Sequence, residues 1–94
     1  MVVDVVTFSL RPEADTASFL EVDKELQALV SIEGAGFIRR TTARSNDGTW
    51  LVVSLWATQP DADASAASTD ATRAAFMGYL DTPTLTRQIF LTLD

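Results

Sequence analysis

Residues 37–57, FIRRTTARSNDGTWLVVSLWA, decide the fold because they predict a β-hairpin. Phe37–Arg44 and Thr49–Ala57 contain the β-branched and aromatic residues that favour strands, and Asn46-Asp47-Gly48 separates them. A three-residue loop that ends in glycine is typical of a type I turn that closes on a G1 bulge. The segments on either side of this hairpin supply the other strands and the helices.

The length of the hairpin loop sets which side chains share a face. With the three-residue loop, Arg40 lies opposite Ser54 and points to the same face as the tryptophans. A two-residue Asp47-Gly48 loop would shift the pairing by one residue and turn Arg39 to that face instead. We favour the three-residue loop and keep the shorter one as the alternative.

Before the hairpin, the sequence predicts one strand and one helix. Val2–Leu10 favours a strand that ends before Pro12, and Asp15 or Thr16 offers a side-chain oxygen to cap a helix. The apolar residues of that helix recur at steps of three and four: Phe19, Val22, Leu26, Leu29 and Val30. Gly34 stands where a helix end favours a residue that accepts a positive φ.

After the hairpin, the sequence predicts two short helices and a last strand. Thr58 caps the first helix, and Ser68-Thr69-Asp70 marks the start of the second. The apolar face of the second helix consists of Phe76, Met77 and Leu80. Asp81–Thr84, which contains Pro83, is predicted to be a loop, and Leu85–Leu93 is predicted to be a strand.

The element order is therefore β-α-β-β-α-β, with the second helical region broken in two. Short connections and right-handed crossovers fold this order into a four-stranded antiparallel sheet with helices on one face. We expect a single ferredoxin-like α+β domain over residues 1–94.

Composition excludes several classes of protein. The chain has 94 residues with a formal charge of −6, and 47% of them are hydrophobic, as expected for a folded domain. Since it contains no cysteine and no histidine, disulfides, Cys/His zinc sites, Ser-His-Asp triads and histidine-ligated haem are excluded within one chain. The acidic balance argues against nucleic-acid binding, including binding by an aromatic RNA-recognition sheet. We expect no cofactor and no metal.

Targeting and membrane signals are also missing from the sequence. No stretch approaches the ~20 apolar residues that a membrane-spanning helix needs. The N-terminus lacks a basic leader followed by an apolar block. We therefore expect a cytoplasmic protein with no membrane partner.

Alternation along the strands divides their side chains between two faces. We expect the helices to cover an aliphatic set: Leu51, Val53, Leu55, Leu85, Ile89, Leu91 and Leu93, with Arg87 near one end. The opposite face would then expose a more aromatic set: Val6, Phe8, Trp50, Trp56 and Phe90. Because monomers rarely leave such a patch in water, we expect a homodimer that buries it.

Four polar residues share that aromatic face in this interpretation: Asp4, Arg40, Ser54 and Gln88. A carboxylate and a guanidinium in an apolar enclosure are typical of a ligand pocket. Asp4 and Arg40 are therefore candidate catalytic residues, and the candidate substrate-binding residues are Phe8, Trp50, Ser54, Trp56, Gln88 and Phe90. The alternative is structural: Asp4 and Arg40 pair with each other or with water, and the tryptophans only pack.

Three short motifs resemble those of the dimeric α+β-barrel proteins, in the branch related to antibiotic biosynthesis monooxygenases. They are the opening strand Val2-Val3-Asp4-Val5-Val6-Thr7-Phe8, Gly36-Phe37 followed by Arg40, and Gly48-Thr49-Trp50 leading to Trp56. The resemblance implies a homodimer formed sheet to sheet, with a cavity between sheet and helices. It matches Asp4 to an acidic residue that is frequent in the first strand of the family. The histidine of the haem-degrading branch has no counterpart here.

Two functions compete on this basis. The first is a cofactor-free monooxygenase that acts on an aromatic or polyketide-like molecule. In it, Asp4 would accept a substrate proton, helped by a pKa raised in apolar surroundings, and Arg40 would stabilise the resulting enolate or phenolate. Phe8, Trp50 and Trp56 would stack on the rings. The second is a non-catalytic ligand-binding or regulatory dimer.

Overall fold

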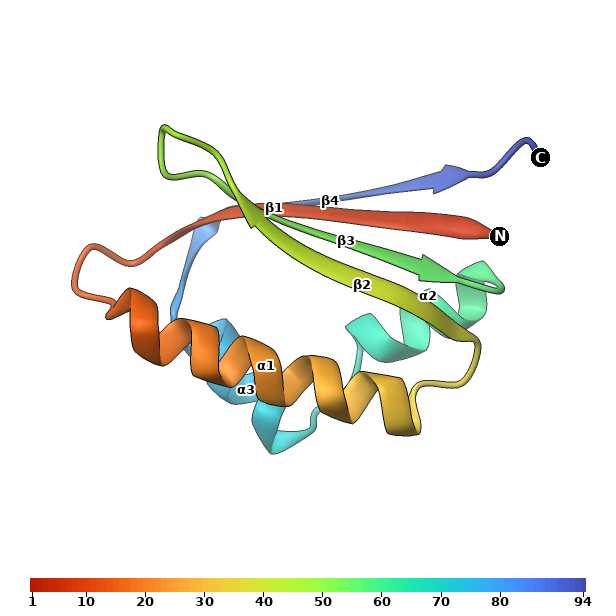
Figure 1. Cartoon of the computed structure of the whole chain (residues 1–94), viewed down its shortest axis with the longest axis horizontal. Helices are drawn as coiled ribbons and strands as arrows, with labels where there is room; N and C mark the ends of the chain where they lie inside the picture. The colour runs from red at the N-terminus through yellow and green to blue at the C-terminus, as the bar shows by residue number, and fades with distance from the viewer.

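The computed structural model describes residues 1–94 and confirms the ferredoxin-like arrangement. Its elements are β1 (Val2–Leu10), α1 (Thr16–Glu33), β2 (Phe37–Arg44), β3 (Trp50–Trp56), α2 (Gln59–Ala66), α3 (Ala71–Gly78) and β4 (Leu80–Leu91). The strands form one antiparallel sheet in the order β2-β3-β1-β4. All the helices lie against one face and leave the other open (Figure 1). None of them combines the length and the apolar character needed to cross a membrane.

The hairpin has the register predicted for a three-residue loop. Arg40 pairs with Ser54, and the Ser45 N–H donates to the Thr49 carbonyl at 2.8 Å. Gly48 closes the loop with a φ of 88°, the left-handed conformation that a G1 bulge requires. Arg40, not Arg39, therefore points toward the tryptophan face.

The helix starts follow the predicted caps. The Asp15 carboxylate accepts the Ser18 N–H at 3.0 Å at the start of α1. Thr58 caps α2 and Asp70 caps α3 in the same way. Side-chain oxygens thus satisfy backbone donors at all three helix starts.

The expectation for Gly34 was wrong. Its φ is −75°, whereas Gly36, two residues later, has the positive φ of 73°. Gly34 is constrained by space instead, because a Cβ there would lie 2.5 Å from the Val30 carbonyl oxygen. The chain therefore turns from α1 into β2 at Gly36.

The last strand begins earlier than predicted, at Leu80, and ends at Leu91. The β1–β4 pairing shifts between Thr7, which faces Thr86, and Ser9, which faces Asp81. The residues between those two β4 partners include Pro83 and form a bulge, where a proline costs no ladder hydrogen bond. The predicted loop is thus an irregularity inside one strand.

The two faces of β1 and β3 are the reverse of our expectation. Phe8 packs edge-on against Phe76 with centroids 5.8 Å apart, and Trp50 packs against Phe19 at 5.0 Å. Phe8 and Trp50 therefore lie beneath the helices, together with buried Trp56. Both faces are apolar, so alternation separates the two sets without saying which one the helices cover. The larger side chains fill the space between the two layers.

The face assignment of β4 was correct over most of its length. Leu85 and Ile89 pack against the core, whereas Phe90 lies beside Val3 on the open face and is 47% exposed. Leu91 and Leu93 are not covered by the helices, contrary to expectation: Leu91 is 68% exposed, and Leu93 lies beyond the end of the strand and is fully exposed.

Candidate functional site

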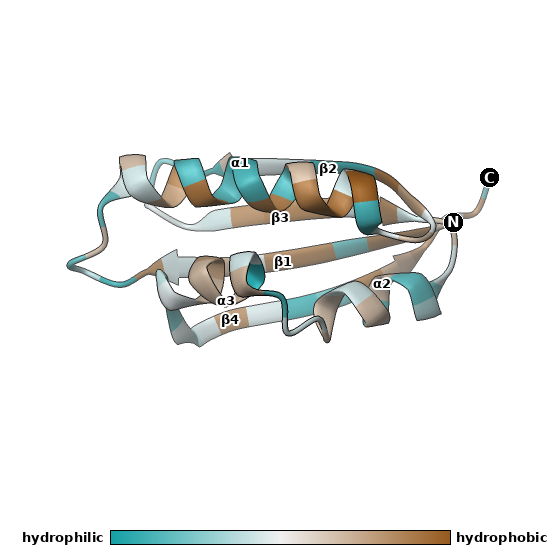
Figure 2. Cartoon of the chain, turned by 90° about the horizontal axis from the view of Figure 1, so that it is seen from below, coloured by the Kyte–Doolittle hydropathy of each residue, from teal (hydrophilic) through white to brown (hydrophobic).

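A cavity of about 190 Å³, which we call the sheet cavity, lies between the sheet and the helices. Its polar wall residues are Asp4, Arg40, Ser54, Ser65, Arg73 and Arg87. The apolar wall includes Val6, Leu26, Val52, Trp56, Phe76, Met77, Leu80 and Leu85. In Figure 2, α1 covers one half of the sheet while α2 and α3 cover the other, so that the site is roofed by all three helices.

A second cavity of about 260 Å³, which we call the helix cavity, lies between the end of α1 and the α2–α3 segment. The residues that line this cavity and not the sheet cavity include Val30, Glu33, Asp61 and Asp70. Four residues line both cavities: Leu26, Trp56, Ser65 and Arg73. The two cavities therefore adjoin one another along this shared wall.

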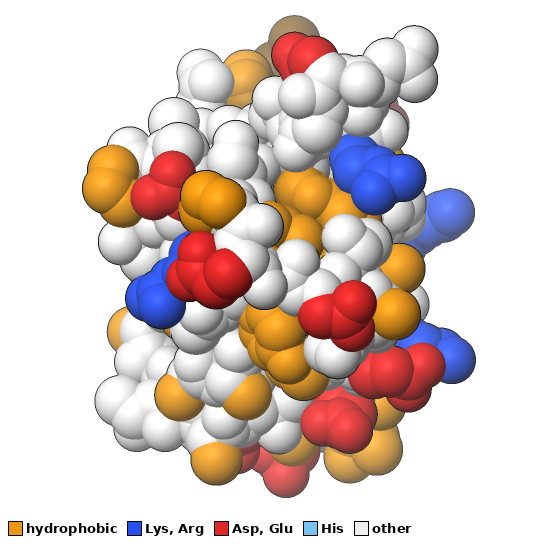
Figure 3. Space-filling view, turned by 90° about the vertical axis from the view of Figure 1, so that its left-hand side faces the viewer, with side chains coloured by type: hydrophobic (Ala, Val, Ile, Leu, Met, Phe, Trp, Pro, Cys, Tyr) orange, Lys and Arg blue, Asp and Glu red, His pale blue; other side chains and the backbone are white.

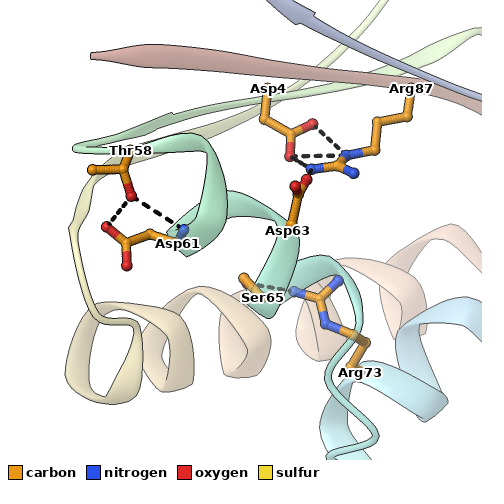
Figure 4. A network of polar contacts seen from close by, with 7 residues as sticks. All are labelled: Asp4, Thr58, Asp61, Asp63, Ser65, Arg73 and Arg87. Carbon is orange, nitrogen blue, oxygen red and sulfur yellow. Dashed lines mark hydrogen bonds and ion pairs between the residues drawn. The ribbon is translucent and has the colours of Figure 1, made fainter.

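Asp4 is held by Arg87 from the neighbouring strand β4. The Arg87 Nε donates to both carboxylate oxygens, at 3.3 and 3.1 Å, and its Nη2 donates to Oδ2 at 2.9 Å. The same Nη2 reaches Asp63 of α2 at 2.9 Å, which joins the sheet to that helix (Figure 4). The hydrogen bonds to Asp4 are the main cause of a raised pKa for Arg87.

Arg40 is held by Asp23 of α1 and not by Asp4. Its Nη2 donates to the Asp23 Oδ1 at 2.7 Å, and both side chains are almost completely buried. Thr42 donates to the same oxygen at 3.1 Å. The Arg40 guanidinium also lies 5.7 Å from the centre of the Phe76 ring, within range of a cation–π interaction.

Arg73 of α3 forms no ion pair, unlike Arg40 and Arg87. Its Nη2 donates to the Ser65 hydroxyl at 3.1 Å (Figure 4). Partial burial, followed by repulsion from Arg40, lowers the pKa of Arg73. A guanidinium thus lines both cavities without a direct ion pair, and only the more distant carboxylates of Asp4 and Asp70 attract its charge.

The structure brings together only some of the predicted site residues. Asp4, Arg40, Ser54 and Trp56 line the sheet cavity. Phe8 and Trp50 belong to the aromatic packing around Phe19. Gln88 and Phe90 lie on the opposite face of the sheet, paired with Val5 and Val3.

Sequence reasoning missed Asp23 and Arg73, although both carry a detectable signal. Asp23 falls within the apolar stripe of α1, four residues after Phe19 and three before Leu26. Arg73 precedes buried Phe76 by three residues and so lies on the inward face of α3. A charged residue inside an apolar helical stripe indicates a buried partner or a cavity wall.

The model of the antibiotic biosynthesis monooxygenase family matches residues 1–77. The chain belongs to this family. As a member of the antibiotic biosynthesis monooxygenases, it adopts their ferredoxin-like α+β fold. No protein of curated function matches it.

Solved structures share this fold at low sequence identity. SnoaB from Streptomyces nogalater, a cofactor-independent oxygenase, is 18% identical with a TM-score of 0.80, over 99% of this chain and 93% of that one. A Caulobacter crescentus protein assigned to the same family is 21% identical with a TM-score of 0.82, over 99% and 90%. At3g17210 from Arabidopsis thaliana is 14% identical with a TM-score of 0.80, over 100% and 97%. These likenesses establish the fold of this antibiotic biosynthesis monooxygenase family member.

Proposed function

We propose that this chain is a cofactor-independent oxygenase that admits an aromatic or polyketide-like molecule to the sheet cavity. The observation that carries the proposal is the cavity wall, which one carboxylate, Asp4, shares with apolar side chains and three guanidinium groups. Such a wall suits a planar apolar molecule that acquires negative charge during reaction. Membership of the family and the likeness to SnoaB, a cofactor-independent oxygenase, support the same function.

Asp4 is the proposed proton acceptor because it is the only carboxylate in the wall of the sheet cavity. Arg87 now occupies both of its oxygens, so the proton transfer must weaken this ion pair. Once Asp4 is neutral, Arg87 keeps only its ion pair with Asp63, and its charge can also act on the new substrate anion. Arg40, fixed by Asp23, would stabilise the same enolate or phenolate from β2.

The proposed reaction needs only dioxygen as the oxidant. An activated CH₂ group of the substrate loses a proton to Asp4, and the resulting carbanion transfers electrons to dioxygen. A C–O bond forms, and protonation gives a hydroperoxide. Loss of water then leaves a carbonyl group, so that CH₂ and O₂ become C=O and H₂O.

The other predicted site residues divide into two groups in this proposal. Trp56 and Ser54 would contact the substrate directly, because both line the sheet cavity. Phe8 and Trp50 would support its aromatic wall through Phe76 and Phe19. Gln88 and Phe90 would serve an interface on the open face.

Oxygen consumption with 1,8-dihydroxyanthrone, an aromatic probe with an activated CH₂ group, tests this function. We expect Asp4→Asn to reduce turnover by about 100-fold, the order of a lost general base. Asp63→Asn is the matched control, since it removes the exposed carboxylate partner of the same Arg87 and leaves the cavity wall intact. Equal turnover by wild type and Asp4→Asn would refute the role of Asp4. Binding of the probe without oxygen consumption would instead favour the ligand-binding module.

We also propose that the protein is a homodimer formed through the open face of the sheet. Its side chains include Val3, Val5, Leu51, Val53, Leu55 and Phe90. No helix of the same chain covers them (Figure 1). A contiguous apolar face of this kind is typical of an interface between copies.

A further inference from the structure

We propose that the shared wall of the two cavities binds an aromatic carboxylate, with the carboxylate on Arg73 and the ring beside Trp56. This inference deepens the proposed function, since it names the substrate class of the same site. It rests on that function only for the claim that the bound molecule also reacts.

The shared wall combines the groups that an aromatic acid requires. Arg73 and Ser65 provide adjacent nitrogen and oxygen atoms 3.1 Å apart, both able to donate to a carboxylate. Trp56 and Leu26, which line both cavities, provide the apolar surface for a ring. An acid with its ring in the sheet cavity can therefore reach Arg73 without leaving the wall.

Among the three arginines of the sheet cavity, Arg73 is the one that is available to an anion. Asp23 pairs with Arg40, and Asp4 and Asp63 both pair with Arg87, whereas no carboxylate lies within ion-pair distance of Arg73. Three of the seven lysine and arginine residues of the chain thus line one cavity, although the net charge is −6. Outside, acidic, basic and apolar side chains intermingle at the end formed by the hairpin tip and the β1–α1 loop (Figure 3).

The donor set favours a carboxylate over a phosphate. One guanidinium and one hydroxyl match the two oxygens and single charge of a carboxylate. A phosphate dianion is typically bound by several backbone N–H groups or by clustered cations. The other two arginines of the sheet cavity are already occupied by aspartates.

The test compares 2-naphthoate with its neutral isostere 2-naphthamide by isothermal titration calorimetry. We expect wild type to bind the acid at least about tenfold more tightly, the order of one charge-assisted hydrogen bond. Arg73→Gln should abolish this preference, while affinity for the amide changes little. Lys24→Gln is the matched control, because it removes one positive charge from an exposed position on α1 and should preserve the preference.

Thermal unfolding of the same variants separates recognition from a structural role. A binding residue that is partly buried without an ion-pair partner should not stabilise the free protein, so the Tm of Arg73→Gln should equal or exceed that of wild type. Equal binding of acid and amide by wild type, or binding of neither, would overturn the proposal. Preference for the acid that survives in Arg73→Gln would also overturn it. Oxygen consumption with the anthrone probe is measured separately, so either proposal can fail alone.

Discussion

Asp23 is the residue that allows Arg40 to be buried. Its carboxylate accepts from Arg40 and from Thr42, and the two charged side chains are only 5% and 10% exposed. Removing the acid would leave a buried guanidinium with the weaker contacts to Gln27 and Thr42, at 3.5 and 3.4 Å. Removing one partner of a buried ion pair destabilises the fold by more than the intact pair stabilised it, because the other charge stays buried without a partner.

We therefore expect Asp23→Ala to lower the free energy of unfolding by about 3–5 kcal/mol, as measured by urea denaturation. Asp63→Ala provides the contrast, because Asp63 is half exposed and shares Arg87 with Asp4. Its cost should be about 1 kcal/mol or less, the usual contribution of an exposed ion pair. Similar losses for the two variants would mean that burial of the Arg40–Asp23 pair has no energetic consequence.

Connections between elements depend on two glycines with positive φ. Gly36 joins α1 to β2 at 73°, and Gly48 closes the hairpin at 88°. A Cβ at Gly48 would meet nothing within 4 Å, whereas one at Gly36 would collide with the Asp61 side chain. The two sites therefore separate the cost of the backbone conformation from the cost of a steric clash.

We expect Gly48→Ala to destabilise the fold by about 1–2 kcal/mol, the cost of a left-handed conformation for an L-residue. Gly36→Ala should cost more, because Asp61 must also move away from Thr58. Gly78→Ala, at the end of α3, is the control, since it has free space and no positive φ and should be neutral or slightly stabilising. Urea denaturation should therefore show the largest loss for Gly36→Ala, a smaller one for Gly48→Ala and none for Gly78→Ala, and equal losses at positions 36 and 48 would contradict the clash.

For the helices and strands, the sequence predicted which elements form better than it predicted where they begin and end. Side-chain caps such as Asp15, Thr58 and Asp70 act within one turn, so their residues indicate them directly. The boundary at Leu80 depends on pairing with Leu10, seventy residues earlier in the chain, which no local pattern reveals. Pro83 led to the prediction of a loop, because the residues next to it in sequence do not reveal that β4 forms a bulge at this position.

For the whole molecule, the sequence predicted the topology and the hairpin register but not which side of the sheet the helices cover. Val52 and Val53 illustrate why: they alternate correctly, yet either one suits a core. The same ambiguity limited the site. Asp4 and Arg40 were selected as a pair that shares a face, and both do line the sheet cavity, but their partners come from β4 and α1. Partners far apart in sequence follow only from the packed structure.

Because the two faces of β1 and β3 are reversed, the argument for a dimer now rests on the aliphatic open face and not on the aromatic residues. The open face is aliphatic at its centre, where Val5 pairs with Val53, and Phe90 stands beside Val3. Phe8, Trp50 and Trp56 are already buried within the protomer, so dimerisation is not needed to cover them. The apolar open face is what remains uncovered, and in the proposed dimer a second copy would present the matching surface.

If the proposed dimer forms through the open face, Val53→Glu should convert it to a folded monomer, because the variant places a carboxylate in the apolar face that the second copy would bury. Native mass spectrometry gives the mass, and circular dichroism checks that the variant still folds. Ala28→Glu adds the same charge at an exposed position of α1 and should leave the dimer intact. A monomeric wild type, or a Val53→Glu variant that remains dimeric, would show that the open face is not the interface.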